Sequence, residues 1–237
     1  MAEAILPISG KEDRVSTRSK RRILLEVAAA YALILLVIWT PRPWQKILWW
    51  VAAAAVAAIA AASFNGLKSL GLGKKNLLKS LWITAAALLM AVIAVITAIG
   101  LDTLHLPSGG VFAFVKTYWA YALWACVQQL LLQAFFLPRF LCLFPSRINA
   151  ALVAASLFAL AHLPNPILTP LTLIWGFVAC LLFLHYRNLY PLALAHVVFG
   201  ITIAITVPGP LSHNMRVGLG YLTYHHPVRH STGLPQP

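Results

Sequence analysis

The apolar run from Tyr118 to Leu137 is the feature that most constrains what this chain can fold into. About twenty residues rising ~1.5 Å each match a hydrocarbon core of ~30 Å, so the run is long enough to cross a bilayer as a helix. It carries three amide side chains, at Gln128, Gln129 and Gln133. Because an unpaired amide is costly in lipid, we expect these side chains to face other helices or a cavity. Hydrogen bonding between helices and a polar functional site both remain open.

The composition is that of a polytopic membrane protein. The chain is 61% hydrophobic and 10% charged, against about 45–50% and about 25% in soluble domains. We expect an all-α, polytopic integral membrane bundle of seven or eight transmembrane helices. The expected spans are 23–39, 47–64, 78–101, 111–137, 148–162, 167–186 and 189–207, and Pro138 and Arg139 are expected to end the fourth. The patch 217–224 is too short to span alone, so an eighth span stays open.

One transmembrane domain is expected. It covers residues 23–207, between a basic tail at 1–22 and a polar, histidine-containing tail at 208–237. If the N-terminus is inside and seven spans alternate, 13 of the 18 basic residues fall on the inner side. This bias predicts a cytoplasmic N-terminus, and we place the protein in a plasma membrane, of the bacterial inner-membrane kind. The net charge of +13 fits an anionic leaflet, and no aromatic-and-basic motif indicates nucleic acid.

Three polar points in the C-terminal half suggest a shared site. After the glutamines come His162, in the sequence Phe-Ala-Leu-Ala-His, and His196, in the sequence His-Val-Val-Phe-Gly. A lone histidine in a membrane helix most often bonds to a neighbouring helix, but two histidines together with amides favour a common pocket. We expect both histidines and at least one of Gln128 and Gln129 to face one cavity, open toward the cytoplasmic side.

These motifs resemble the CAAX-protease and bacteriocin-processing (CPBP, or Abi) family of intramembrane endopeptidases. That family carries Glu-Glu-x-x-x-Arg on one helix, Phe-x-x-x-His on the next, and His-x-x-x-Asn, or a small residue in place of Asn, on a later one. Phe158 to His162 matches the second motif, and His196 to Gly200 matches the third, with Gly200 where Asn is common. The resemblance covers about 119–207 and implies cleavage of prenylated or membrane-embedded peptides.

The first motif departs from the family pattern. The sequence Gln128-Gln129-Leu-Leu-Leu-Gln133 stands where the family has Glu-Glu-x-x-x-Arg. In the family, a glutamate activates water and the histidines support the metal or the oxyanion. A glutamine amide holds a water but does not act as a base near neutral pH. No acid follows Asp102, and Glu26, near the inner end of the first span, lacks motif context.

The function therefore has two main readings. One is an intramembrane endopeptidase scaffold that still cleaves its peptide, and the other is a catalytically inactive relative that binds a membrane peptide or a partner protein. A small transporter is disfavoured, because the spans carry no charged relay and the chain shows no repeat symmetry.

The resemblance also assigns the site. The candidate catalytic residues are Gln128, Gln129, His162 and His196, with Gln133, Phe158 and Gly200 as second choices. His162 and His196 are also the candidate ligands of a divalent metal such as zinc, although catalytic zinc usually has three protein ligands and no third is evident. A neutral histidine acting as base would be a different mechanism.

Helix rise gives a check on the shared pocket. It places Gln129 about 12 Å and His196 about 9 Å from the inner face, but His162 about 21 Å from it. A shared pocket therefore requires a tilt, or a fifth run that bends back at Pro164.

Overall fold

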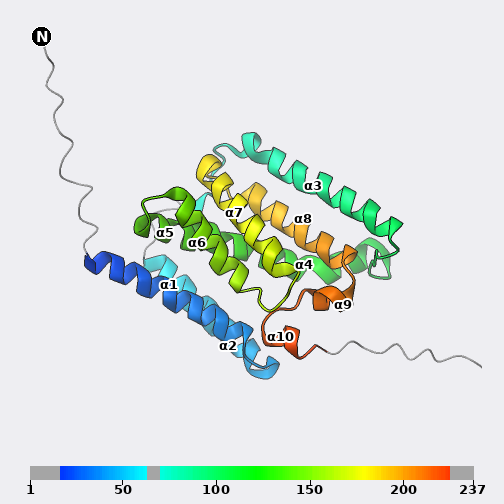
Figure 1. Ribbon diagram of the computed structural model, residues 1–237, viewed down its shortest axis with the longest axis horizontal. Coiled ribbons are helices and arrows are strands. Elements are labelled where there is room, and N and C mark those ends of the chain that lie inside the picture. Colours follow the sequence, from blue (N-terminus) through cyan, green and yellow to red (C-terminus); the bar gives the residue numbers. More distant parts are fainter. Residues whose placement is uncertain (1–16, 63–69, 225–237) are drawn as a thin grey trace, which may run out of the picture.

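The computed structural model describes residues 17–62 and 70–224, and these ranges contain helices and connections but no strand (Figure 1). The long helices are α1 (Thr17–Ile38), α2 (Arg42–Ala62), α3 (Leu77–Gly100), α4 (Gly110–Leu130), α6 (Arg147–Leu160), α7 (Leu168–Tyr186) and α8 (Tyr190–Thr206). The expected all-α class is therefore confirmed. The first helix begins at Thr17, six residues before the expected span, while most other boundaries agree closely.

Three helical segments of the described chain are long and apolar enough to cross a membrane. They are Leu77–Gly100, Gly110–Leu143 and Leu168–Tyr186, and Arg147–Leu160 and Tyr190–Thr206 are shorter apolar helices. Large apolar side chains on these segments, such as Ile96 and Ile174, lie exposed on the outside, as expected of a surface that faces lipid. The total of seven or eight spans remains a prediction.

The expectation that Pro138 and Arg139 end the fourth span is wrong. After α4 the chain passes through a π-helical turn, η2 (Leu131–Phe136), and continues as α5 (Leu137–Leu143). In this turn the Leu137 N–H donates to the carbonyl of Leu132, five residues back. A proline lacks an N–H and its ring crowds the carbonyl four residues earlier, and the wider π turn accommodates both problems without ending the helix.

The helices pack in neighbouring pairs. The closest pairs are α6 with α7, α3 with α8, α4 with α8, and α1 with α2. In Figure 1, α3 runs along one edge of the molecule and the α1–α2 pair along the opposite edge, with α4, α6, α7 and α8 between them. The inner helices therefore place the polar motifs in the middle of the bundle.

Small residues allow α6 and α7 to approach closely. Ala150, Ala151, Ala154 and Ala155 are all buried on α6. A Cβ at Gly176 of α7 would lie 3.1 Å from the Phe158 ring. Association in lipid depends on such close packing, because lipid gives apolar helices no hydrophobic driving force.

Two buried asparagines hold the connections at the ends of these helices. The Asn188 amide donates to the carbonyls of Gly73 and Lys75 at 3.0 Å, which fixes the α7–α8 turn beneath the segment before α3. The Asn165 amide donates to the carbonyls of Ser212 (2.8 Å) and Arg216 (3.0 Å), which fixes the α6–α7 turn to the C-terminal segment. Both side chains thus satisfy backbone groups that have no helical partner.

The C-terminal segment contains short turns: α9 (Gly209–Ser212), η3 (His213–Met215) and α10 (Leu219–Leu222). The apolar patch expected at 217–224 thus has four helical residues, too few to span a bilayer. The Gly218 N–H donates to the Leu163 carbonyl at 2.7 Å, so this segment is fastened across the end of α6.

Candidate functional site

A half-open cavity of about 900 Å³ lies between the helices of the bundle, and we call it the central cavity. Most of its lining is apolar and comes from α1, α2, α3, α4, α6, α7 and α8, with Met215 and Val217 from the C-terminal segment. The polar motif residues on its wall are Gln128, His162 and His196. Both histidines and one of the two glutamines therefore lie on one cavity, as the sequence pattern suggested.

Phe158 and His162 form one wall of the central cavity. They are one helical turn apart, and their rings are 4.9 Å apart between centroids. The Phe158 ring also meets the His196 ring edge to face at 5.6 Å, so the phenylalanine lies between the two histidines. The His162 Nδ1 lies 2.7 Å from the Phe158 carbonyl oxygen. Because a carbonyl only accepts, Nδ1 carries the proton, and Nε2 is left as the acceptor atom of this ring.

His196 has the opposite arrangement. Its Nδ1 lies 3.0 Å from Nε2 of Gln129, and an amide nitrogen only donates, so Nδ1 accepts and the ring proton sits on Nε2. The Gln129 oxygen accepts from Nε2 of Gln133 at 3.3 Å. The two histidines thus have opposite hydrogen-bonding roles at Nε2. Nε2 of His162 is an acceptor, and Nε2 of His196 is a donor.

Gln129 and Gln133 lie behind His196 and do not line the central cavity. Both side chains are fully buried, and the Gln133 oxygen has no hydrogen-bond partner among the described residues. Gln128 is turned toward the cavity instead. The three glutamines therefore divide into one that faces the cavity and two that position a histidine.

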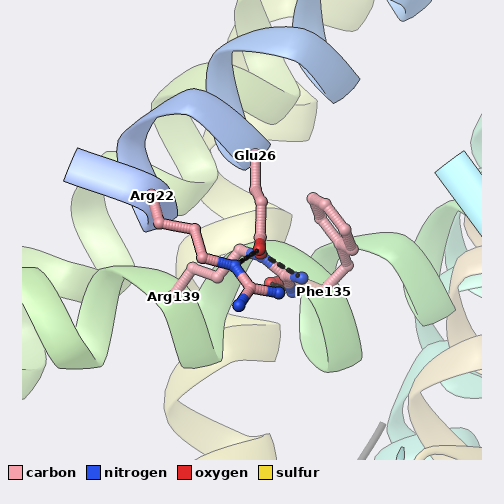
Figure 2. A network of polar contacts seen from close by, with 4 residues as sticks. All are labelled: Arg22, Glu26, Phe135 and Arg139. Carbon is pink, nitrogen blue, oxygen red and sulfur yellow. Dashed lines mark hydrogen bonds and ion pairs between the residues drawn. The ribbon is translucent and has the colours of Figure 1, made fainter. Parts of the chain in front are cut away.

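Glu26 and Arg139 form an ion pair that the sequence did not reveal. Figure 2 shows the Glu26 carboxylate between Arg139 of α5 and Arg22 of its own helix. Arg139 donates from Nε and Nη2 to one carboxylate oxygen at 3.1 and 2.9 Å, and Arg22 donates to the other at 2.9 Å. Arg139 also donates to the Phe135 carbonyl at 2.9 Å and lies over the Phe135 ring.

This ion pair removes Glu26 from consideration as a base at the histidines. The carboxylate lines a second cavity of about 710 Å³, and it is absent from the described lining of the central cavity. Asp102, the other acid in the described ranges, is exposed in the turn after α3 and is absent from that lining as well. Within residues 17–62 and 70–224, the central cavity thus has no carboxylate on its wall.

The donor set does not fit a catalytic zinc ion. Among the described residues, no cluster of three or more His, Cys, Asp or Glu side chains is placed to hold a metal. His162 and His196 provide two nitrogen ligands at most, and the His196 Nδ1 is already bonded to Gln129. We therefore derive no chemical step through a metal ion.

Tyr121 is a cavity residue that the sequence motifs did not indicate. It lies on α4 two turns before Gln128, and its side chain covers Gly200 of α8. A Cβ at Gly200 would overlap the Tyr121 hydroxyl, so the absence of a side chain at 200 is what admits the phenol ring. Tyr121 and Gly200 are 79 positions apart in the chain, so no local sequence pattern reveals that they pack together.

The longer fourth segment changes the depth of Gln129, so that it agrees with His162 and differs from His196. Gln129 lies fourteen positions before Leu143, the end of α5, and His162 lies fifteen positions after Arg147, the start of α6. At 1.5 Å per residue these are about 21 and about 22 Å, so the two agree. The sequence-based depth of Gln129 was measured from Leu137, where a helix end was predicted. His196 remains about 9 Å from the start of α8 although it contacts Gln129, so the ends of these helices do not lie at one level.

An α-helical membrane bundle with a histidine-lined internal cavity is thus the class that the fold and site define. Comparison with protein families matches residues 110–202 to the family described as Type II CAAX prenyl endopeptidase Rce1-like. The matched segment contains α4, Phe158, both cavity histidines and Gly200, which confirms the resemblance to the CAAX-protease and CPBP family. The apolar helices and this match support an integral membrane protein in which residues 110–202 are similar to a CAAX-type endopeptidase. Neither the curated proteins nor the solved structures gave a match.

Proposed function

We propose that this protein binds a lipidated or membrane-embedded peptide in the central cavity and does not hydrolyse it by a carboxylate-dependent route. The observation that carries the proposal is the cavity wall, which combines an apolar lining and two histidines with no carboxylate among the described residues. Water attack on an amide needs a proton acceptor, and general-base help is worth about 10²–10⁴-fold in rate. Glutamine does not supply that help, whereas the apolar volume and polar groups needed for binding are kept.

The occupant we propose has an apolar chain and a polar backbone. A volume of about 900 Å³ lies at the upper end of the range of ligand pockets, so it holds a lipid chain together with a few peptide atoms. The lining aromatic residues, including Trp124 and Trp175, offer broad apolar contact, and Gln128, His162 and His196 offer hydrogen bonds.

Photo-crosslinking tests this binding. The purified full-length protein in lipid nanodiscs is mixed with a farnesylated tetrapeptide that carries a diazirine on its lipid chain. We expect crosslinks on the central cavity wall, competed by unlabelled farnesylated peptide. Ala91→Trp places a large side chain in the cavity from α3 and should abolish these crosslinks. Ala85→Trp, an exposed position outside the described lining on the same helix, should leave them unchanged. Crosslinks that survive Ala91→Trp would overturn the proposal.

A second function, slow histidine-based hydrolysis, is favoured by one observation. The His162 Nδ1–H donates to the Phe158 carbonyl, which leaves Nε2 as an acceptor for a proton from water. The Gln129 amide bonds to Nδ1 of His196, which leaves the Nε2–H available to donate to a carbonyl oxygen of the bound peptide. His162 and His196 together therefore support weak hydrolysis of the peptide. This activity should be lost in His162→Ala and should persist in Gln128→Ala.

A further inference from the structure

The Tyr121 hydroxyl is an unpaired polar group on the central cavity wall. None of the described residues forms a hydrogen bond with it, whereas Tyr31, the other tyrosine of the lining, donates to the Leu157 carbonyl at 3.1 Å. The Trp175 indole nitrogen also lacks a partner, but that atom is enclosed. The Tyr121 oxygen is not among the enclosed atoms without a partner, so it keeps accessible surface, and its residue lines the central cavity. A group of this kind is costly in an apolar cavity unless a ligand or water bonds to it.

The position of this hydroxyl is set by Gly200. Gly200 lies one helical turn after His196, so the space above it faces the same side of α8 as the histidine. The phenol fills that space from α4 and places its oxygen where a side chain at 200 would begin. The backbone positions of His196 and Gly200 are about 6 Å apart along α8, the rise of four residues.

We propose that Tyr121 is a positioning residue that donates a hydrogen bond to a backbone carbonyl oxygen of the peptide bound in the central cavity. The ligand class is a peptide with an apolar chain and an amide carbonyl, because an amide oxygen accepts a hydrogen bond and carries no charge into the apolar cavity. The inference rests on the proposed function, since it assigns one contact of the same bound peptide. A hydroxyl donor in this place holds the carbonyl near His196 and fixes the register of the peptide along α8.

The test uses the full-length protein in nanodiscs and a farnesylated tetrapeptide with a ¹³C-labelled carbonyl on the prenylated cysteine. Tyr121→Phe removes one oxygen and keeps the ring over Gly200. It should weaken binding about tenfold, the loss expected for one hydrogen bond in an apolar cavity. It should also move the labelled carbonyl stretch to higher wavenumber in the infrared spectrum, which a purely structural role would not do. Tyr118→Phe removes a hydroxyl from the same helix outside the described cavity lining and should change neither quantity.

Substitutions that exchange side-chain size between positions 121 and 200 test the inference independently. Tyr121→Ala should weaken binding at least as much as Tyr121→Phe, because it removes both the ring and the hydroxyl. Adding Gly200→Asn to Tyr121→Ala places an amide donor in the vacated space and should recover most of the affinity and the lower carbonyl wavenumber. Gly200→Asn alone should weaken binding, because it overlaps the tyrosine.

The outcomes separate the inference from the proposed function. If the wild type fails to bind the farnesylated peptide, the proposed function fails and the inference falls with it. If the wild type binds and Tyr121→Phe binds equally well with an unchanged carbonyl band, the inference alone is overturned. Weaker binding by Tyr121→Phe with a shifted band, alongside an unchanged Tyr118→Phe control, supports it.

Discussion

At the residue scale, an amide in place of a carboxylate reverses the hydrogen bond to His196. A carboxylate accepts only, so it would hold a proton on Nδ1, whereas the Gln129 amide donates to Nδ1 and moves the proton to Nε2. The substitution is therefore more than the loss of a base. It also turns the accessible nitrogen of His196 from an acceptor into a donor, which suits binding of a carbonyl oxygen.

The tautomer of His196 is directly measurable. We expect the ¹⁵N spectrum of histidine-labelled wild-type protein to show the Nε2–H form at His196, and Gln129→Glu to convert that ring to the Nδ1–H form. Gln128→Glu adds an acid at the neighbouring position, whereas the hydrogen bond to Nδ1 of His196 comes from Gln129, so this variant should leave the ring unchanged. The same His196 tautomer in wild type and Gln129→Glu would contradict a hydrogen bond donated by Gln129 to Nδ1 of His196.

The sequence predicted part of this site, and the remainder depended on tertiary contacts. The short motifs were enough to group His162 with His196 and a glutamine, because polar side chains at membrane depth face other helices or a cavity and not lipid. They did not separate Gln128 from Gln129, since adjacent residues on a helix point about 100° apart and only packing decides which one faces a cavity. Tyr121 was missed because its role depends on a missing side chain on another helix.

At the element scale, α1 is held to α5 through the Glu26–Arg139 ion pair (Figure 2). The two residues are 113 positions apart, and no periodicity in the sequence pairs them. Helix periods and lengths were predictable because they follow from local apolar runs. The continuation of the fourth segment through Pro138 was not predictable. Proline is expected to end a helix on local grounds, whereas the π turn that accommodates Pro138 is stabilised by the surrounding core.

Two arginines on the same carboxylate offer a matched comparison of stability. The Arg139 side chain is 10% exposed, whereas the Arg22 side chain is 67% exposed. Arg139→Gln should lower the free energy of unfolding by about 2–3 kcal/mol, because it leaves the Glu26 carboxylate without its buried partner. Arg22→Gln should cost less than about 0.5 kcal/mol. Thermal unfolding in detergent, followed by helical circular dichroism, measures both. Equal losses of unfolding free energy in the two variants would show that burial of the arginine does not determine the strength of its ion pair with Glu26.

At the scale of the whole molecule, the charge bias predicts which ends face the cytoplasm. We expect Lys74→Cys in a cysteine-free background to react with an impermeant maleimide from the cytoplasmic side. His105→Cys, between α3 and α4, and Gln236→Cys in the tail should react only from the opposite side, if seven spans alternate. Labelling of Gln236→Cys from the cytoplasm alone would require an even number of spans and would reverse the placement of the C-terminal segment.

The central claim is that the protein has a protease-like scaffold but does not carry out carboxylate-dependent hydrolysis. A turnover assay tests this claim most directly. Purified wild type is compared with Gln129→Glu, with Gln129→Glu plus Gln133→Arg, and with His162→Ala and His196→Ala, on farnesylated and transmembrane peptides. Little or no cleavage by wild type is expected. The variants that restore an acid should gain activity, because a carboxylate at 129 would hold the His196 proton on Nδ1 and leave Nε2 as a base, and general-base help is worth about 10²–10⁴-fold. Robust cleavage by wild type that His162→Ala and His196→Ala abolish would contradict the account, since it would show that the histidines had replaced the missing base.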